Sequence, residues 1–164
     1  MDNIIIKRLN KEEVIDLLDD MFNIINTNMK DIIDTGVNTK DNYINWKDSM
    51  IEELGNVNKR WIGAFKNNKL IGYFLYKTDN DILKLDEIQI IKKYQGDGYT
   101  FNSLFRMIFN DKDISNDYKV IAYANKNNIK SNDILKHFGF NVLEQKINGT
   151  KYITSYKKLK EKLD

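Results

Sequence analysis

The sequence has no cysteine, no proline and a single histidine, His137. Without cysteine the chain can form no disulfide, no thiol nucleophile and no cysteine zinc site. One histidine leaves at most one candidate for a Ser-His-Asp triad or a histidine-rich centre, so we expect no metal. The chain also lacks an apolar run of the length that a signal peptide or a membrane span needs. We therefore expect a cytoplasmic protein without a membrane partner.

An excess of charge of one sign is missing too. Lys and Arg number 26 and Asp and Glu 24, which gives a net charge of +2. Arginine, the side chain that reads phosphate in a bidentate manner, is scarce. We therefore expect no nucleic-acid partner. A nucleic-acid-binding alternative rests on Lys92-Lys93 and Lys157-Lys158, which lie beside tyrosines.

Apolar side chains are plentiful enough for a core. Of the 164 residues 41% are hydrophobic and 12% are aromatic, whereas disordered chains are poor in these residues. The length fits one domain, which we expect to span residues 1–164.

Hydrophobic periodicity and turn residues predict the element order β-α-α-β-β-β-α-β-α-β-β. Asn10 and Glu13 form a capping box at the start of the first helix, and Asn148-Gly149 is a hairpin signal. Residues 27–37 are ambiguous. The order predicts an α/β (α+β) fold with a mixed sheet of about seven strands and about four helices. The predicted strands cover residues 3–9, 61–65, 70–76, 82–91, 119–124, 140–147 and 152–156. The predicted helices cover residues 10–25, 39–54, 98–110 and 128–138.

A loop with Gly96 and Gly98 follows the predicted strand 82–91, and a predicted helix begins directly after it. Backbone N–H groups at such a turn lack helical partners, and a pyrophosphate fits them. Glycine leaves no Cβ in the way of the phosphate. On these grounds alone the loop is equally well an ordinary tight turn. It is neither a Walker A loop nor a Rossmann fingerprint.

The segment 95–100, Gln-Gly-Asp-Gly-Tyr-Thr, resembles the pyrophosphate loop of the GNAT family of acyl-CoA-dependent N-acetyltransferases. That loop has Gln or Arg, two free positions, Gly, one free position, and Gly or Ala. Gln95 and Gly98 match it, and Thr100 departs from it. A second GNAT motif is matched by Asn128, Ser131, Ile134, Gly139 and Phe140. Leu135 stands where many members carry the tyrosine that protonates the departing thiolate.

The resemblance implies the GNAT acyl-CoA N-acyltransferase fold, with acetyl-CoA bound in a V-shaped opening between strands 82–91 and 119–124. The pantetheine pairs with backbone near Ile88 and Ile90, and the pyrophosphate lies on the loop. The implied cofactor-binding residues are Ile88, Ile90, Gln95, Gly96, Asp97, Gly98, Tyr99, Thr100, Asn128 and Ser131. A Gly98→Val change is expected to weaken CoA binding by about 2 kcal/mol or more, and to affect folding less than binding unless φ is positive there.

In similar enzymes a Glu on this strand deprotonates the substrate ammonium, and Glu87 is our candidate base, with Asp86 second. The alternative is a structural carboxylate paired with Lys84 or water. Tyr123 could replace the missing acid, but packing in the core is the preferred interpretation, and His137 is interpreted as a surface residue.

The implied function is N-acetyl transfer from acetyl-CoA to a primary amine, by direct attack in a ternary complex because no cysteine is available. The alternative is a non-catalytic acyl-CoA-binding or regulatory module, since Leu135 replaces the acid. The acceptor, a small-molecule or peptide amine, stays open, as does a homodimer.

Overall fold

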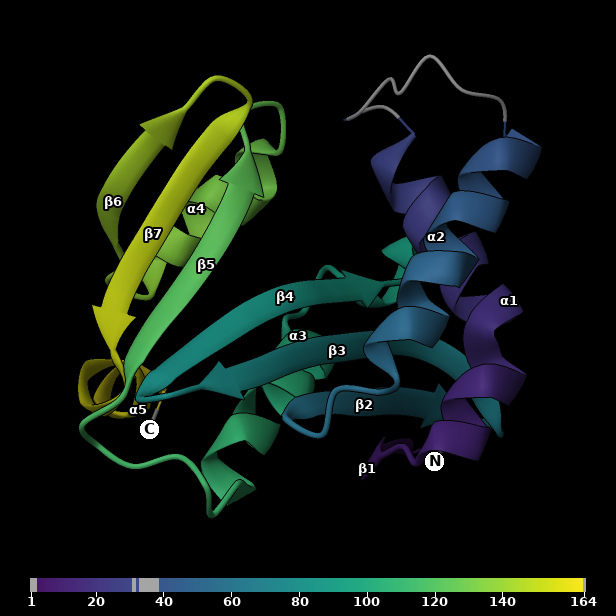
Figure 1. Cartoon of the computed structure of the whole chain (residues 1–164), viewed down its shortest axis with the longest axis horizontal. Helices are drawn as coiled ribbons and strands as arrows, with labels where there is room; N and C mark the ends of the chain where they lie inside the picture. The colour runs from purple at the N-terminus through teal and green to yellow at the C-terminus, as the bar shows by residue number, and fades with distance from the viewer. Residues whose placement is uncertain (1–2, 31, 33–38, 164) are drawn as a thin grey trace. The chain divides into compact units, whose positions relative to one another are not determined.

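The computed structural model describes residues 3–30, 32 and 39–163 (Figure 1). Seven strands form one mixed sheet in the order β1-β2-β3-β4-β5-β7-β6. The strands are β1 Ile4–Arg8, β2 Lys59–Lys66, β3 Lys69–Asp79, β4 Ile82–Ile90, β5 Lys119–Asn125, β6 Asn141–Lys146 and β7 Gly149–Ser155. The α-helices are α1 Lys11–Met29, α2 Thr39–Glu53, α3 Tyr99–Phe105, α4 Ile129–His137 and α5 Tyr156–Leu163. Two short 3₁₀ helices are η1 Lys92–Tyr94 and η2 Arg106–Asn110.

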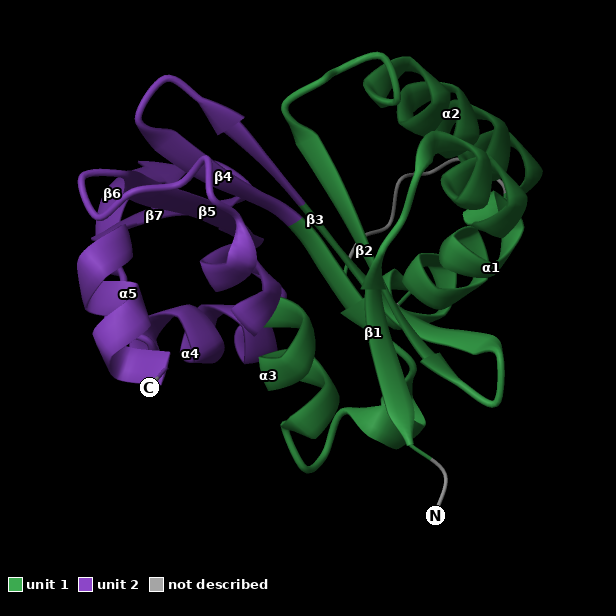
Figure 2. Ribbon diagram, turned by 90° about the horizontal axis from the view of Figure 1, so that it is seen from below, with its two compact units in different colours: residues 1–75, 87–105 green, residues 76–86, 106–164 purple. Residues whose placement is uncertain are grey.

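The chain is divided into two compact units (Figure 2). Unit 1 comprises residues 1–75 and 87–105, and unit 2 comprises residues 76–86 and 106–164. A single domain over the whole chain therefore stays a prediction. The glycine loop and Glu87 belong to unit 1, whereas the second motif, on α4, belongs to unit 2.

The core of unit 1 is built around α1. The Asn10 side chain accepts a hydrogen bond from the Glu13 N–H at 2.9 Å, and the Glu13 carboxylate accepts one from the Asn10 N–H at 3.1 Å. This confirms the predicted capping box. Val14, Leu18 and Met21 recur at helical spacing and are fully buried. They pack with side chains from β2 and β3, namely Trp61, Leu70, Tyr73 and Leu75.

In the first hairpin, asparagine occupies the turn positions that glycine or proline often takes. Asn67 and Asn68, which join β2 to β3, have φ values of 51° and 63°. Asparagine tolerates this left-handed region better than most residues, so the predicted turn is confirmed. The turn predicted over residues 78–81 is wrong in extent, because β3 continues to Asp79 and the chain reverses at Asn80, where φ is 43°.

The helix predicted over residues 98–110 is also corrected. It ends at Phe105, and the following five residues form η2. Phe105, the last residue of α3, is buried at 3% exposure, and Ile108 of η2 is fully buried.

In unit 2, β5 pairs in parallel with β4, from Ile82↔Lys119 to Leu85↔Ala122. Its other edge pairs antiparallel with β7 from Lys119↔Ser155 to Asn125↔Gly149. Among the strands that the structure describes, β6 pairs with β7 alone, and every residue of β6 is exposed. Its register on β7 shifts between Val142 and Glu144.

Two corrections concern the end of the chain. The β6–β7 turn consists of Ile147 and Asn148, one residue earlier than predicted, and Gly149 is the first residue of β7. A Cβ on Gly149 would lie 2.3 Å from the Ala124 carbonyl oxygen, so glycine serves close strand packing there. Helix α5 was not predicted, and Tyr156 begins it instead of ending a strand.

Candidate functional site

The C-terminal end of β4 leaves one backbone edge open to side chains. The Ile90 carbonyl accepts hydrogen bonds from Gln95 Nε2 at 2.7 Å and Asn28 Nδ2 at 2.9 Å. The next residue, Ile91, donates its N–H to the Ile71 carbonyl of β3 at 2.9 Å. Because neighbours along a strand direct their amides to opposite edges, the Ile90 N–H and C=O lie on the edge away from β3. Gln95, predicted as a cofactor residue, thus supports the strand end.

The glycine loop that follows has the backbone freedom that close approach of an anion requires. Gly98 adopts φ +73°, a conformation that favours glycine. A Cβ on Gly96 would meet nothing within 4 Å, so this position faces open space. The Asp97 carboxylate accepts a hydrogen bond from the Tyr99 N–H at 3.0 Å, which shows a loop amide already holding an anionic oxygen. Thr100 is 1% exposed, so its hydroxyl lies inside the unit.

Lysines add positive charge beside this loop. Lys66 and Lys93 lie over the ring of Tyr94 at 5.3 and 5.6 Å from its centre. Both distances are within the range of cation–π contacts, so each ammonium group is held near the Tyr94 ring, directly before the loop. The surroundings of the loop therefore favour a negatively charged ligand.

Glu87 is held by a buried tyrosine. The Tyr73 hydroxyl donates to Glu87 Oε1 at 2.8 Å, and Tyr73 is fully buried while Glu87 is half-buried. Burial first, and then the charge and hydrogen bond of Glu87, raise the pKa of Tyr73 well above its ordinary value. Tyr73 therefore stays protonated and donates to Glu87, an arrangement that favours the ionised carboxylate.

The neighbouring carboxylate on β4, that of Asp86, has a lysine as its partner. Asp86 Oδ2 lies 3.9 Å from Lys77 Nζ, within unit 2. Lys84, considered above as a partner of the strand carboxylates, lies 3.5 Å from Asp79 instead. Both partners, Lys77 and Asp79, come from β3. Sequence alone does not fix which residues of two strands face each other.

The second motif appears in unit 2 as the start and end of α4. Asn128 Oδ1 accepts a hydrogen bond from the Ser131 N–H at 3.1 Å, so Asn128 is the N-cap of the helix. Leu135, in the position of the family's acid, is buried at 9% exposure. His137 is exposed in the last turn, where it was expected. Gly139 follows with φ +84°.

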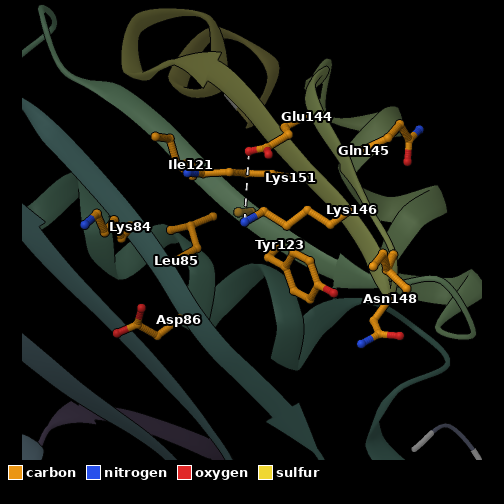
Figure 3. Close-up of a pocket in the computed structure, with 12 residues that line it drawn as sticks. Lys84, Leu85, Asp86, Ile121, Tyr123, Glu144, Gln145, Lys146, Asn148 and Lys151 are labelled. Atoms are coloured by element: carbon orange, nitrogen blue, oxygen red, sulfur yellow. Dashed lines mark ion pairs between the residues drawn. The ribbon is translucent and has the colours of Figure 1, made fainter.

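Unit 2 also contains a pocket that the sequence did not indicate (Figure 3). It has a volume of about 820 Å³ and an apolar floor made by Leu85, Ile121 and Ala122. Tyr123 lines it at 49% exposure, which contradicts its interpretation as core packing. The remaining lining residues come from β4, β6, the β6–β7 turn and β7, namely Lys84, Asp86, Glu144, Gln145, Lys146, Ile147, Asn148 and Lys151.

No protein-family model matches the sequence, and no curated protein matches it either. Solved structures do match. The PaiA N-acetyltransferase of Thermoplasma acidophilum, in complex with coenzyme A, has a TM-score of 0.73 at 17% identity, over 94% of this chain and 99% of its own. An acetyltransferase of Thermus thermophilus has a TM-score of 0.68 at 15% identity, over 93% and 97%. Apo FdhC, a nucleotide-linked sugar GNAT, has a TM-score of 0.69 at 11% identity, over 98% and 91%. The chain has the GNAT fold.

The GNAT fold confirms the predicted fold class and the mixed sheet of seven strands. Five α-helices are described where about four were expected, because α5 was missed. At these identities the likeness establishes the fold and gives no residue a role. Within the described ranges, no three His, Asp or Glu side chains gather as they do around a metal ion. None of the described helices is long and apolar enough to cross a membrane.

Proposed function

We propose that this protein is an acetyl-CoA-dependent N-acetyltransferase that acetylates a primary amine by direct attack in a ternary complex. The observation that carries the proposal is the glycine loop after β4, where Gly98 has φ +73° and Gly96 faces open space. Such a loop admits a pyrophosphate against its backbone amides. The GNAT fold supports the proposal, since a structure with the same fold binds coenzyme A.

The residues present fit this cofactor. In the proposal, the backbone near Ile88 and the N–H of Ile90 pair with the pantetheine arm, since the Ile90 carbonyl already accepts from Gln95 and Asn28. The loop amides hold the pyrophosphate. The side chain of Asn128 caps α4, so Asn128 and Ser131 act chiefly through the backbone at the helix start. The loop residues in these roles are Gln95, Gly96, Asp97, Gly98, Tyr99 and Thr100.

Bound acetyl-CoA supplies an activated acetyl group. Glu87 is the proposed base, because an amine attacks only after losing the proton of its ammonium form. Tyr73 keeps the Glu87 carboxylate oriented and ionised through its 2.8 Å hydrogen bond. The Ile90 N–H lies on the open edge of β4 and is a donor for a carbonyl oxygen. The sequence has no cysteine to carry the acetyl group, in agreement with direct transfer.

Calorimetry with coenzyme A, together with thiol release from acetyl-CoA over a panel of amines, tests the proposal. We expect parent protein to bind CoA and release thiol with at least one amine class. Glu87→Gln is expected to bind CoA as the parent does and to lower turnover about 100-fold, the usual scale for losing a general base. Glu161→Gln, an exposed carboxylate on α5, controls for the lost charge. Absence of CoA binding contradicts the proposal.

A second candidate function is a non-catalytic acyl-CoA-binding module. It is favoured by Leu135, which is buried and cannot donate a proton where the family has its acid. A thiolate can also leave with a proton from water, so this observation alone does not remove activity. CoA binding without thiol release across the whole panel supports the module, and turnover with any amine excludes it.

A further inference from the structure

The charges that line the pocket of unit 2 are paired with one exception. Lys84 is 3.5 Å from Asp79, Asp86 is 3.9 Å from Lys77, and Lys146 is 4.0 Å from Glu144. These contacts leave the ammonium of Lys151 as the uncompensated charge among the lining residues that the structure describes.

Strand register explains why Lys151 points into the pocket. On β7 it lies opposite Tyr123 of β5 and opposite Glu144 of β6, so the three side chains form one row on one sheet face. Glu144 is engaged by Lys146 (Figure 3). The Lys151 side chain instead extends over β5 in the direction of Ile121 (Figure 3). A half-buried ammonium above an apolar floor gains much from an anion placed beside it.

The other unengaged groups define the rest of the ligand. Tyr123 presents half of its surface and its hydroxyl to the pocket, and Asn148 adds an amide from the turn. Leu85, Ile121 and Ala122 offer apolar contact. An apolar floor with a few convergent polar groups is the ordinary composition of a small-molecule site, and 820 Å³ lies within the usual size range.

We infer that this pocket binds the acceptor, and that the acceptor is an amine with an apolar body and a carboxylate, which Lys151 holds. One uncompensated positive charge matches one negative charge, which favours a carboxylate over a phosphate ester. The identification of the ligand as the acceptor rests on the proposed N-acetyltransferase function. Recognition of the carboxylate rests on the pocket alone.

Three probes with the same apolar skeleton separate these features: 3-phenylpropanoate has the carboxylate alone, 2-phenylethylamine has the amine alone, and L-phenylalanine has both. Binding to the parent protein is measured by NMR titration at low salt without CoA. We expect both carboxylates to bind about tenfold or more tightly than the amine, the scale of a charge-assisted hydrogen bond. Equal or tighter binding of 2-phenylethylamine, or no binding of either carboxylate, overturns the inference.

Variants identify the residue. Lys151→Met keeps an aliphatic stem and is expected to remove the preference for carboxylate, whereas Lys151→Arg retains it. Lys157→Met removes the same charge from the exposed face of α5 and is expected to change nothing. Retained preference in Lys151→Met overturns the role of Lys151.

A kinetic comparison separates this inference from the proposed function. In thiol release, the KM of L-phenylalanine is expected to lie about tenfold below that of 2-phenylethylamine, and to rise in Lys151→Met without a matching fall in kcat. Carboxylate binding without any thiol release leaves the pocket assignment standing and refutes the transferase. Thiol release with equal KM values for the two amines supports the transferase and refutes the pocket assignment.

Discussion

A single hydrogen bond links a packing residue to the proposed chemistry. Tyr73 has the position and burial of an ordinary core aromatic. Its hydroxyl nevertheless contacts Glu87, fourteen positions along the chain. Which residues meet across β3 and β4 depends on register, so this pairing has no local signal in the sequence. Glu87 itself could be predicted as a candidate base from the sequence, because a carboxylate in a central strand is unusual.

Replacing Tyr73 by Phe should change the pH dependence of catalysis more than the binding of the cofactor. Loss of the donor disfavours ionised Glu87, so the acid limb of kcat/KM is expected to move up by about one pH unit. The affinity for CoA should stay unchanged. The measurement is a pH–rate profile for thiol release from about pH 3.5 to 9, which includes the range in which a glutamate carboxylate ordinarily titrates.

Tyr76→Phe provides the matched control. Tyr76 is also fully buried, and its hydroxyl donates to the Asp111 carboxylate at 3.0 Å. Asp111 has no part in the proposed chemistry, so this variant should keep the parent's acid limb. A shift of equal size in both variants would show a general packing effect and remove Tyr73 from the mechanism.

At the scale of elements, the two glycines of the loop differ: Gly98 is constrained by its backbone conformation, whereas Gly96 borders open space. The expectation that Gly98→Val spares folding carried the condition that φ is not positive, and φ is +73°. A side chain there costs about 1–2 kcal/mol in backbone strain, so lost binding and lost folding would coincide. Gly96 has no positive φ and open space around its missing Cβ, which makes it the cleaner position for a test.

Gly96→Val is therefore expected to weaken CoA binding about tenfold or more, because its side chain occupies the space in front of the loop amides. Its thermal unfolding should match that of Gly55→Val, an exposed turn glycine without positive φ in the same unit. Calorimetry and thermal melts of both variants decide the matter. Parent-like CoA affinity in folded Gly96→Val would make the loop an ordinary turn.

Elements with a strong local code were predictable, and those fixed by tertiary contact were not. The α1 capping box and the Asn67-Asn68 turn depend on neighbouring residues, and both are confirmed. The β6–β7 turn was predicted one residue too late, because Gly149 is required by its close contact with a β5 carbonyl and not by the turn. Helix α5 did leave a local signal, since Ser155 accepts a hydrogen bond from the Lys158 N–H and Tyr156, Leu159 and Leu163 follow helical spacing.

At the scale of the whole molecule, buried tyrosine makes the fold sensitive to alkali. The pKa of Tyr73 is raised in the folded protein, so folded Tyr73 keeps its proton at a pH where the unfolded chain releases it. Its contribution to stability is complete below about pH 10 and declines as the pH rises further. Tyr156, whose pKa is raised by burial and by Asp111, acts in the same direction.

The free energy of unfolding is expected to fall above about pH 10, with Tyr73 contributing up to about 1.4 kcal/mol per pH unit. Urea unfolding between about pH 8 and 11.5 measures it, and ultraviolet absorbance reports tyrosine ionisation. Lysine titration is common to parent and Tyr73→Phe, so the difference between their curves isolates this residue. Parallel curves for the two proteins would contradict the effect.

The open edge of β6 affects the tendency of the protein to aggregate. An edge strand has unpaired backbone groups with which a strand of another molecule can pair. This one exposes Val142 and Leu143 and contains no proline. The register shift between Val142 and Glu144 breaks the regular ladder, and the charges of Glu144 and Lys146 follow within the same strand. Irregular geometry and charge together act as gatekeepers against amyloid-like stacking, in place of the proline that the chain lacks.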